Sequence, residues 1–213
     1  MEQVSGRIFK LIEEDEAKMS SGRFGVFGAT LVTFFLAEMG DKTQLLSLVL
    51  AARFRKPWPI VLGIFVATLA NHALAGAVGS WVTRMLGPDM LRWVLGLSFI
   101  AMALWMLVPD KLDDAGIKEH PGWGVLLTTT VAFFLAEMGD KTQVATVMLA
   151  AQYQAFVWVV IGTTLGMLLA NAPVVWLGHK LVRRVPLRLV HGISAAIFAV
   201  LGGLALLAPV LGV

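Results

Sequence analysis

The sequence predicts an all-α polytopic membrane protein in which six transmembrane helices form two inverted three-helix repeats. Three observations carry this prediction. The 213 residues are 58% hydrophobic and only 15% charged, whereas a soluble domain carries about 25% charged residues. Six apolar stretches are long enough to cross a bilayer, which takes about 20 residues. The string FFLAEMGDKTQ occurs twice, at residues 34–44 and 133–143.

The six apolar stretches differ in what interrupts them. The second, fifth and sixth have no Asp, Glu, Lys or Arg in their cores, whereas the first and fourth are longer and each contains one copy of the repeated string. Tryptophans fall near most of the predicted ends, as they do in the aromatic belt of membrane proteins. The predicted spans are residues 24–51, 58–82, 90–109, 123–151, 156–179 and 187–211.

The duplication extends beyond the repeated string. The tripeptide LAA at 50–52 recurs at 149–151, and LAN at 69–71 recurs at 169–171. Each half holds three spans, and because three is odd the second half must be inverted relative to the first, an arrangement that places a binding site near the midplane. The predicted units are an N-terminal amphipathic segment 1–23, a first repeat 24–109, a linker 110–122 and a second repeat 123–213.

Charge outside the spans sets the expected surroundings of the chain. Nine Lys and Arg residues follow the first, third and fifth spans and six lie on the opposite side, so the positive-inside rule predicts both termini outside the cytoplasm. The amphipathic segment is expected on the lipid surface or as a solvated tail, and the acidic linker as a solvated connection. No basic face is interleaved with aromatics, which argues against nucleic acid. Cysteine is absent, which excludes thiolate chemistry. The charged start of the chain does not resemble a signal peptide.

Each copy of the string places three charges inside a predicted span. An unpaired charge at the bilayer centre costs about 2.5–3.5 kcal/mol, so the six together would cost on the order of 15–20 kcal/mol. Charges retained at that cost mark a functional site. They are Glu38, Asp41, Lys42, Glu137, Asp140 and Lys141.

The donors in each copy are all oxygen atoms. Glutamate and aspartate are three residues apart, which on a continuous helix puts both carboxylates on one face, and a threonine and a glutamine follow. Oxygen-only ligand sets suit magnesium, calcium and manganese. We therefore predict a divalent cation site built by both copies, with no resident cofactor. Its candidate ligands are Glu38, Asp41, Gln44, Glu137, Asp140 and Gln143.

The charge of this set suits exchange of a cation against protons. Four carboxylates and two lysines leave a net charge of −2, which one divalent cation or two protons would neutralise. Carboxylates held together in a low dielectric cannot all ionise cheaply. We expect Glu38 and Glu137 to couple transport to protons, with Asp41 and Asp140 as the more permanent ligands.

The lysines and glycines of the two copies each have two interpretations. Lys42 and Lys141 lie four residues after the glutamates, at ion-pair spacing, and so compensate their charge; alternatively, they point to headgroups or backbone carbonyls. Gly40 and Gly139 would allow local unwinding, but we favour close helix packing.

Other polar residues in the spans are weaker candidates. Asn71 and Asn171 are matched by the duplication and would add amide oxygens, although an interhelical hydrogen bond is the more common role of such residues. Met39 and Met138 are expected to pack. His72 has alanine at the equivalent position of the second half and is assigned to structure rather than to the site.

These residues carry a family resemblance. EMGDKT at 38–43 and again at 137–142 matches an E-x-G-D-[KR]-[ST] signature without departure. It resembles the family that includes the MneA-type bacterial manganese exporters and the Golgi calcium/manganese–proton antiporters, and it covers the whole chain. The resemblance implies a secondary transporter of the bacterial inner membrane that exports manganese against protons, with the four motif carboxylates as metal ligands. It also implies further ligands at Thr43, Gln44, Thr142 and Gln143.

Three other functions stay open at this point. Calcium/proton exchange is the nearest, since the same oxygens suit calcium. A cation channel would also use acidic rings, but the two lysines would obstruct conduction. An intramembrane protease with paired aspartates is the least supported, and we expect no enzyme activity.

Overall fold

A computed structural model describes residues 21–108, 124–178 and 187–211, which form helices and short turns with no strand among them. The chain is thus all-helical in its described part, as predicted. Residues 1–20 of the predicted amphipathic segment 1–23 and the whole predicted linker 110–122 lie outside the described residues.

Four described helices are long and apolar enough to cross a membrane on their own. Each coincides with one of the predicted spans, and α3 and α4 begin with proline, whose missing N–H is tolerated in the first helical turn. The four helices are α3 (Pro57–Met85), α4 (Pro88–Met106), α7 (Phe156–Leu177) and α9 (Leu187–Leu211).

The other two predicted spans are each divided into two helices. Helix Ser21–Ala37 is followed by α2 (Lys42–Phe54) at a bend of 70°, and α5 (Val125–Glu137) is followed by α6 (Lys141–Tyr153). The last three have 13 residues each, about 20 Å at 1.5 Å per residue, which is short of the ~30 Å hydrocarbon core. The two carboxylates of each string therefore lie on either side of a break rather than on one face of a continuous helix. By length and composition the described residues supply four spans, or five if the bent pair counts as one.

Glycine conformation permits both divisions. Gly40 has a φ of 85° and Gly139 a φ of 75°, in the left-handed region that a Cβ disfavours. No atom lies within 4 Å of a Cβ built on Gly139. The close packing that we favoured for these glycines is therefore wrong for Gly139. At both positions a left-handed turn ends one helix and starts the next.

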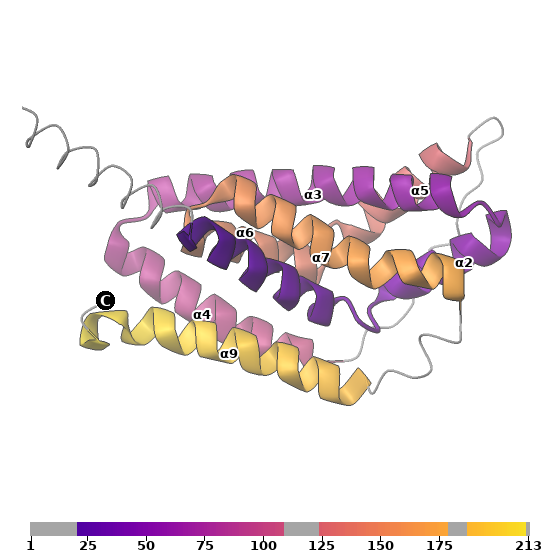
Figure 1. The fold of residues 1–213 in the computed structure, drawn as a ribbon. Coiled ribbons are helices and arrows are strands. Elements are labelled where there is room, and N and C mark those ends of the chain that lie inside the picture. Colours follow the sequence, from indigo (N-terminus) through magenta and orange to yellow (C-terminus); the bar gives the residue numbers. More distant parts are fainter. Residues whose placement is uncertain (1–20, 109–123, 179–186, 212–213) are drawn as a thin grey trace, which may run out of the picture.

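The two divided spans run in opposite directions (Figure 1). Helix Ser21–Ala37 starts at the left of the view and α2 continues to the right, whereas α5 starts at the right and α6 continues to the left. Long α3 packs against α5, α6 and α7, while α7 also packs against α2. Helices α4 and α9 lie side by side at one edge. The divided spans are thus held between α3 and α7.

Glycines on α3 and α7 contact the divided spans in matching ways. A Cβ added at Gly63 of α3 would lie 2.7 Å from Thr129 Cβ of α5. A Cβ added at Gly162 of α7 would collide with the Thr30 side chain and lie 2.9 Å from Phe27 O, both in helix Ser21–Ala37. Residues 63 and 162 are 99 positions apart, as are 30 and 129. Each half of the chain therefore packs a glycine against the equivalent threonine of the other half.

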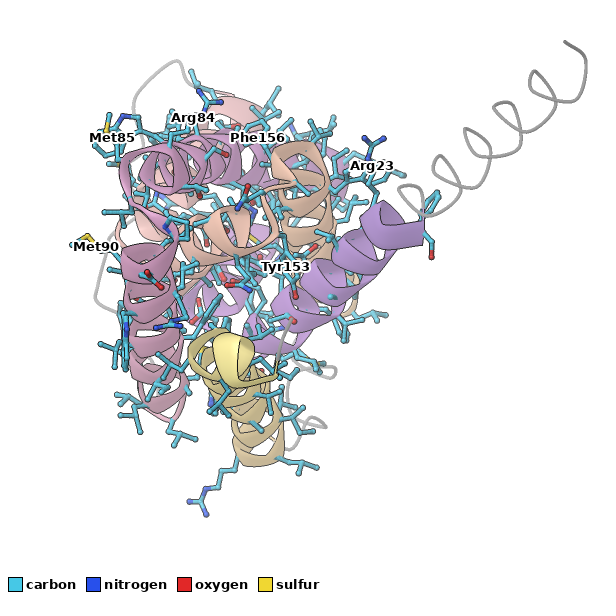
Figure 2. All side chains as sticks on the ribbon, turned by 90° about the vertical axis from the view of Figure 1, so that its left-hand side faces the viewer. Arg23, Arg84, Met85, Met90, Tyr153 and Phe156 are labelled. Atoms are coloured by element: carbon cyan, nitrogen blue, oxygen red, sulfur yellow. The ribbon has the colours of Figure 1, made fainter. Side chains whose placement is uncertain are left out.

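One end of the bundle gathers two chain turns, the start of the first helix and the end of α9. Figure 2 looks onto this end and labels Arg23, the α3–α4 turn with Arg84, Met85 and Met90, and the α6–α7 turn with Tyr153 and Phe156. The end of α9 lies at the same end, while the α2–α3 turn lies at the opposite one (Figure 1).

Candidate cation site at the two helix breaks

We call residues 38–41 the first break and residues 137–140 the second break. Glu38 and Glu137 each lie at the end of a half-helix and are 0% exposed. Asp41 and Asp140 precede the next half-helix in extended conformation and are also buried. Lys42, which follows the first break, lies 3.0 Å from Asp140 of the second break, so the breaks form one electrostatic unit inside the bundle.

Thr43 connects the two carboxylates of the first break. Its hydroxyl donates to Glu38 Oε2 at 2.7 Å and lies 3.3 Å from Asp41 Oδ2. Its backbone N–H donates to the same Asp41 oxygen at 3.5 Å, so Asp41 caps the N-terminus of α2. The threonine predicted as a ligand thus holds both acids in place.

The second break has the same residues but different contacts. The Thr142 hydroxyl donates to Glu137 Oε2 at a longer 3.4 Å. The side chain of Asp140 makes no capping hydrogen bond to α6. Its Oδ1 atom instead lies 3.0 Å from Lys42 Nζ, which belongs to the other half of the chain. The two halves are therefore joined by an ion pair at the breaks.

The two glutamines close the breaks in the same way. Gln44 Oε1 accepts a hydrogen bond from Gly40 N at 3.0 Å, and Gln143 Oε1 accepts one from Gly139 N at 2.7 Å. Each amide oxygen thus satisfies a backbone N–H that the left-handed turn releases from the helix. The amide nitrogens reach the opposite half, where Gln44 Nε2 donates to Ala170 O at 3.1 Å. Their role as ligands stays a prediction.

Both asparagines form the interhelical hydrogen bonds weighed in the sequence. Asn171 of α7 donates to Glu38 Oε2 at 3.4 Å, and its Oδ1 accepts from Ser47 at 2.9 Å. Asn71 of α3 donates to Phe134 O at 3.0 Å and lies 3.4 Å from Gln143 Nε2. Each asparagine therefore contacts the divided span of the other half.

The lysines do not behave as a matched pair. Lys42 bridges to Asp140 across the two halves, so the charge compensation seen here runs between repeats rather than along one helix. Lys141 is buried and its Nζ donates to Val108 O beyond the end of α4 at 2.8 Å. This contact agrees with the alternative considered above, in which the lysine points to a backbone carbonyl.

Two buried residues at the site were missed from the sequence. Ser47 is 0% exposed and hydrogen-bonded to Asn171; its spacing of three residues after Gln44 was the available signal. His72 is 0% exposed, and its Nε2 lies 3.7 Å from Glu137 Oε2. Its assignment to structure alone overlooked that it adjoins Asn71, one of the matched asparagines.

Several buried oxygens at the breaks have lone pairs available to bind a cation. Within the described chain, Glu38 Oε1, Glu137 Oε1 and Asp140 Oδ2 accept no hydrogen bond, although buried polar atoms are normally satisfied. No group of three or more His, Asp and Glu side chains in that part of the chain is arranged to hold a metal ion. The acids are divided between two breaks, so an ion binding to both would draw them together.

Broken apolar helices with buried acids, packed between long spanning helices, define a membrane transporter of small cations. A family model described as "Divalent cation/proton antiporter GDT1" matches residues 26–114 and 125–211. The chain belongs to this divalent cation/proton antiporter family. Its two matched segments each contain one break.

Individual relatives agree with this membership. The chain is 53% identical over 174 residues to a "Putative manganese exporter" of Vibrio cholerae, a match that covers 81% of this chain and 86% of that protein. It is 29% identical over 150 residues to "GDT1-like protein sll0615" of Synechocystis, covering 61% and 72%. It is 25% identical over 208 residues to "GDT1-like protein 3" of rice, covering 85% and 73%. No solved structure is a significant match.

Proposed function

We propose that this protein exports divalent manganese across the bacterial inner membrane in exchange for protons. The observation that carries the proposal is the pair of buried acidic breaks, with three carboxylate oxygens that accept no hydrogen bond in the described chain. Membership of a divalent cation/proton antiporter family supports exchange, and 53% identity to a bacterial manganese exporter homologue supports the ion and the direction.

The charge balance of the breaks accounts for the exchange. Four carboxylates and two lysines carry a net −2, so one divalent cation and two protons neutralise the site equally. Since uncompensated charge in a low dielectric is costly, the site is stable when loaded with either and unstable when empty. Movement of the site across the membrane therefore favours a loaded state.

The glutamates and the aspartates have different roles in this proposal. Glu38 and Glu137, which end their half-helices and repel each other, take up protons when the ion leaves. Asp41 is held by its cap on α2 and stays a ligand, as does Asp140 once Lys42 releases it. Release of Lys42 by an arriving cation would couple binding to a change between the halves.

We further propose six crossings arranged as two inverted repeats, 24–109 and 123–213, joined by the linker 110–122. The opposite directions of the divided spans support this (Figure 1), as do the matched contacts of Gly63 with Thr129 and of Gly162 with Thr30. α5 and α6 together would form the fourth of these crossings in chain order. The charge asymmetry of the loops supports both termini outside the cytoplasm.

Purified protein in liposomes tests the function directly. A pH gradient is imposed without a membrane voltage, and manganese and calcium uptake are followed in competition. Manganese uptake that requires the gradient and persists in excess calcium is expected, with Glu38→Gln inactive. Gradient-driven calcium uptake in preference to manganese would favour calcium/proton exchange, and uptake independent of the gradient would refute an antiporter.

A further inference from the structure

His72 is a buried side chain beside the breaks that the exchange scheme leaves unused. It lies on α3, is 0% exposed, and places Nε2 3.7 Å from Glu137 Oε2. That distance is too long for a hydrogen bond. Neither ring nitrogen has a hydrogen-bond partner among the described residues.

Packing alone does not explain a histidine here. The ring meets Phe34 edge-on with centroids 5.2 Å apart, a contact that phenylalanine would make equally well. A buried polar group without a hydrogen-bond partner is destabilising. An imidazole kept at that cost beside a carboxylate is accounted for by a ligand that both groups bind.

The imidazole also distinguishes the two breaks. The equivalent position in the second half is Ala172, so no second imidazole stands there to face the first break. Glu38 is contacted instead by the amide of Asn171. Nitrogen donation to an ion is thus available at Glu137 from α3 and is not matched at Glu38 by α7.

We propose that His72 is a nitrogen ligand of the transported ion at the second break, and that it selects manganese over calcium. This inference rests on the proposed function. Calcium and magnesium take oxygen ligands, whereas first-row transition ions also bind imidazole, with manganese the weakest of the series. An oxygen cage with one imidazole accepts manganese and disfavours calcium.

The geometry requires little adjustment. Adjacent ligands at about 2.1 Å in an octahedral site are about 3.0 Å apart, and the 3.7 Å between Nε2 and Oε2 closes to that value by small side-chain rotations. Glu137 Oε1, which accepts no hydrogen bond in the described chain, is available to the same ion.

Selectivity of His72→Gln in liposomes is the first measurement, because glutamine replaces nitrogen by oxygen at similar size. We expect the preference for manganese over calcium to fall at least about tenfold, the lower range for loss of a supporting partner at a metal site. Cobalt, which binds imidazole more tightly, is expected to compete with manganese in the parent and less in the variant. Thr83→Val, a part-buried change on the same helix eleven residues from His72, is the control for general destabilisation.

Pulsed electron paramagnetic resonance of bound Mn²⁺, on protein without a histidine tag, gives the second measurement. Nitrogen coupling is expected in the parent and in His191→Gln, and is lost in His72→Gln. Coupling that survives His72→Gln overturns the assignment. So does a change confined to the pH dependence of transport, or an equal loss of both ions. Absence of gradient-driven manganese uptake in the parent would refute the proposed function itself, and is separable from these results.

Discussion

The first and second breaks have identical residues from glutamate to glutamine but different surroundings. At the first, the Met39 side chain is partly buried and His191 of α9 contacts its backbone O at 3.2 Å. At the second, Met138 is 56% exposed and Asp140 is held by Lys42 from the other half. The same local sequence therefore forms the same turn, while the opposite half decides how enclosed it is. In an exchanger built from two inverted halves, a difference in exposure between the two breaks is expected in each of its two alternating states.

Removing the charge of either glutamate is expected to have the largest effect. Glu38→Gln and Glu137→Gln each remove one of the carboxylates needed for a net −2, so manganese transport should fall by ~100-fold or more, the upper range for disturbing a metal site. Initial rates in liposomes measure this. If one variant retained parental rates, the two breaks would not act as a single site.

Breaking the ion pair between Lys42 and Asp140 should have the next largest effect. Lys42→Met leaves Asp140 without its cross-repeat partner, which should cost about 1–3 kcal/mol of stability, less than a fully buried pair because Lys42 is 30% exposed. The double variant Lys42→Asp with Asp140→Lys should recover part of that loss. Thermal unfolding in detergent checks both, and an unchanged midpoint in Lys42→Met would show that the pair contributes nothing.

The glycine at the second break separates backbone from packing effects. Gly139→Ala should destabilise by about 1–2 kcal/mol because alanine disfavours a φ of 75°, and Gly139→Asn should cost less, since asparagine tolerates this region. Unfolding midpoints of the two variants give the comparison. Equal losses would point to a steric cause, which the open space around Gly139 contradicts.

The smallest effect is expected at the ends of the divided spans. Arg55 and Gln154, 99 positions apart, both adopt left-handed conformations, with φ of 51° and 50°. Replacing either by glycine, the preferred residue after a helix, should stabilise by about 0.5 kcal/mol. Parallel melts of the two variants test this, and opposite signs would mean that the two ends are not equivalent.

Much of this architecture follows from local sequence patterns and could therefore be predicted. Apolar length locates the long helices, and the cost of buried charge singles out the four acids. The breaks were missed because Glu-Met-Gly-Asp fits a helix as well as a turn; the available signal was glycine followed by aspartate, a helix end and a helix cap. Contacts such as Lys42 with Asp140 and His72 with Glu137 join residues about 65–100 positions apart, and no local pattern encodes them.

The exchanged glycine contacts have a consequence for how the protein is made. Gly63 of α3 packs on Thr129, which is synthesised 66 residues later. Thr30 of helix Ser21–Ala37 can likewise contact Gly162 only after α7 has been synthesised. Contacts this distant in sequence are slow to form. Neither contact can form before the second half of the chain has been synthesised, and until then Glu38 lacks the Asn171 amide that contacts it. The first break therefore acquires its full set of contacts only after α7 has been made.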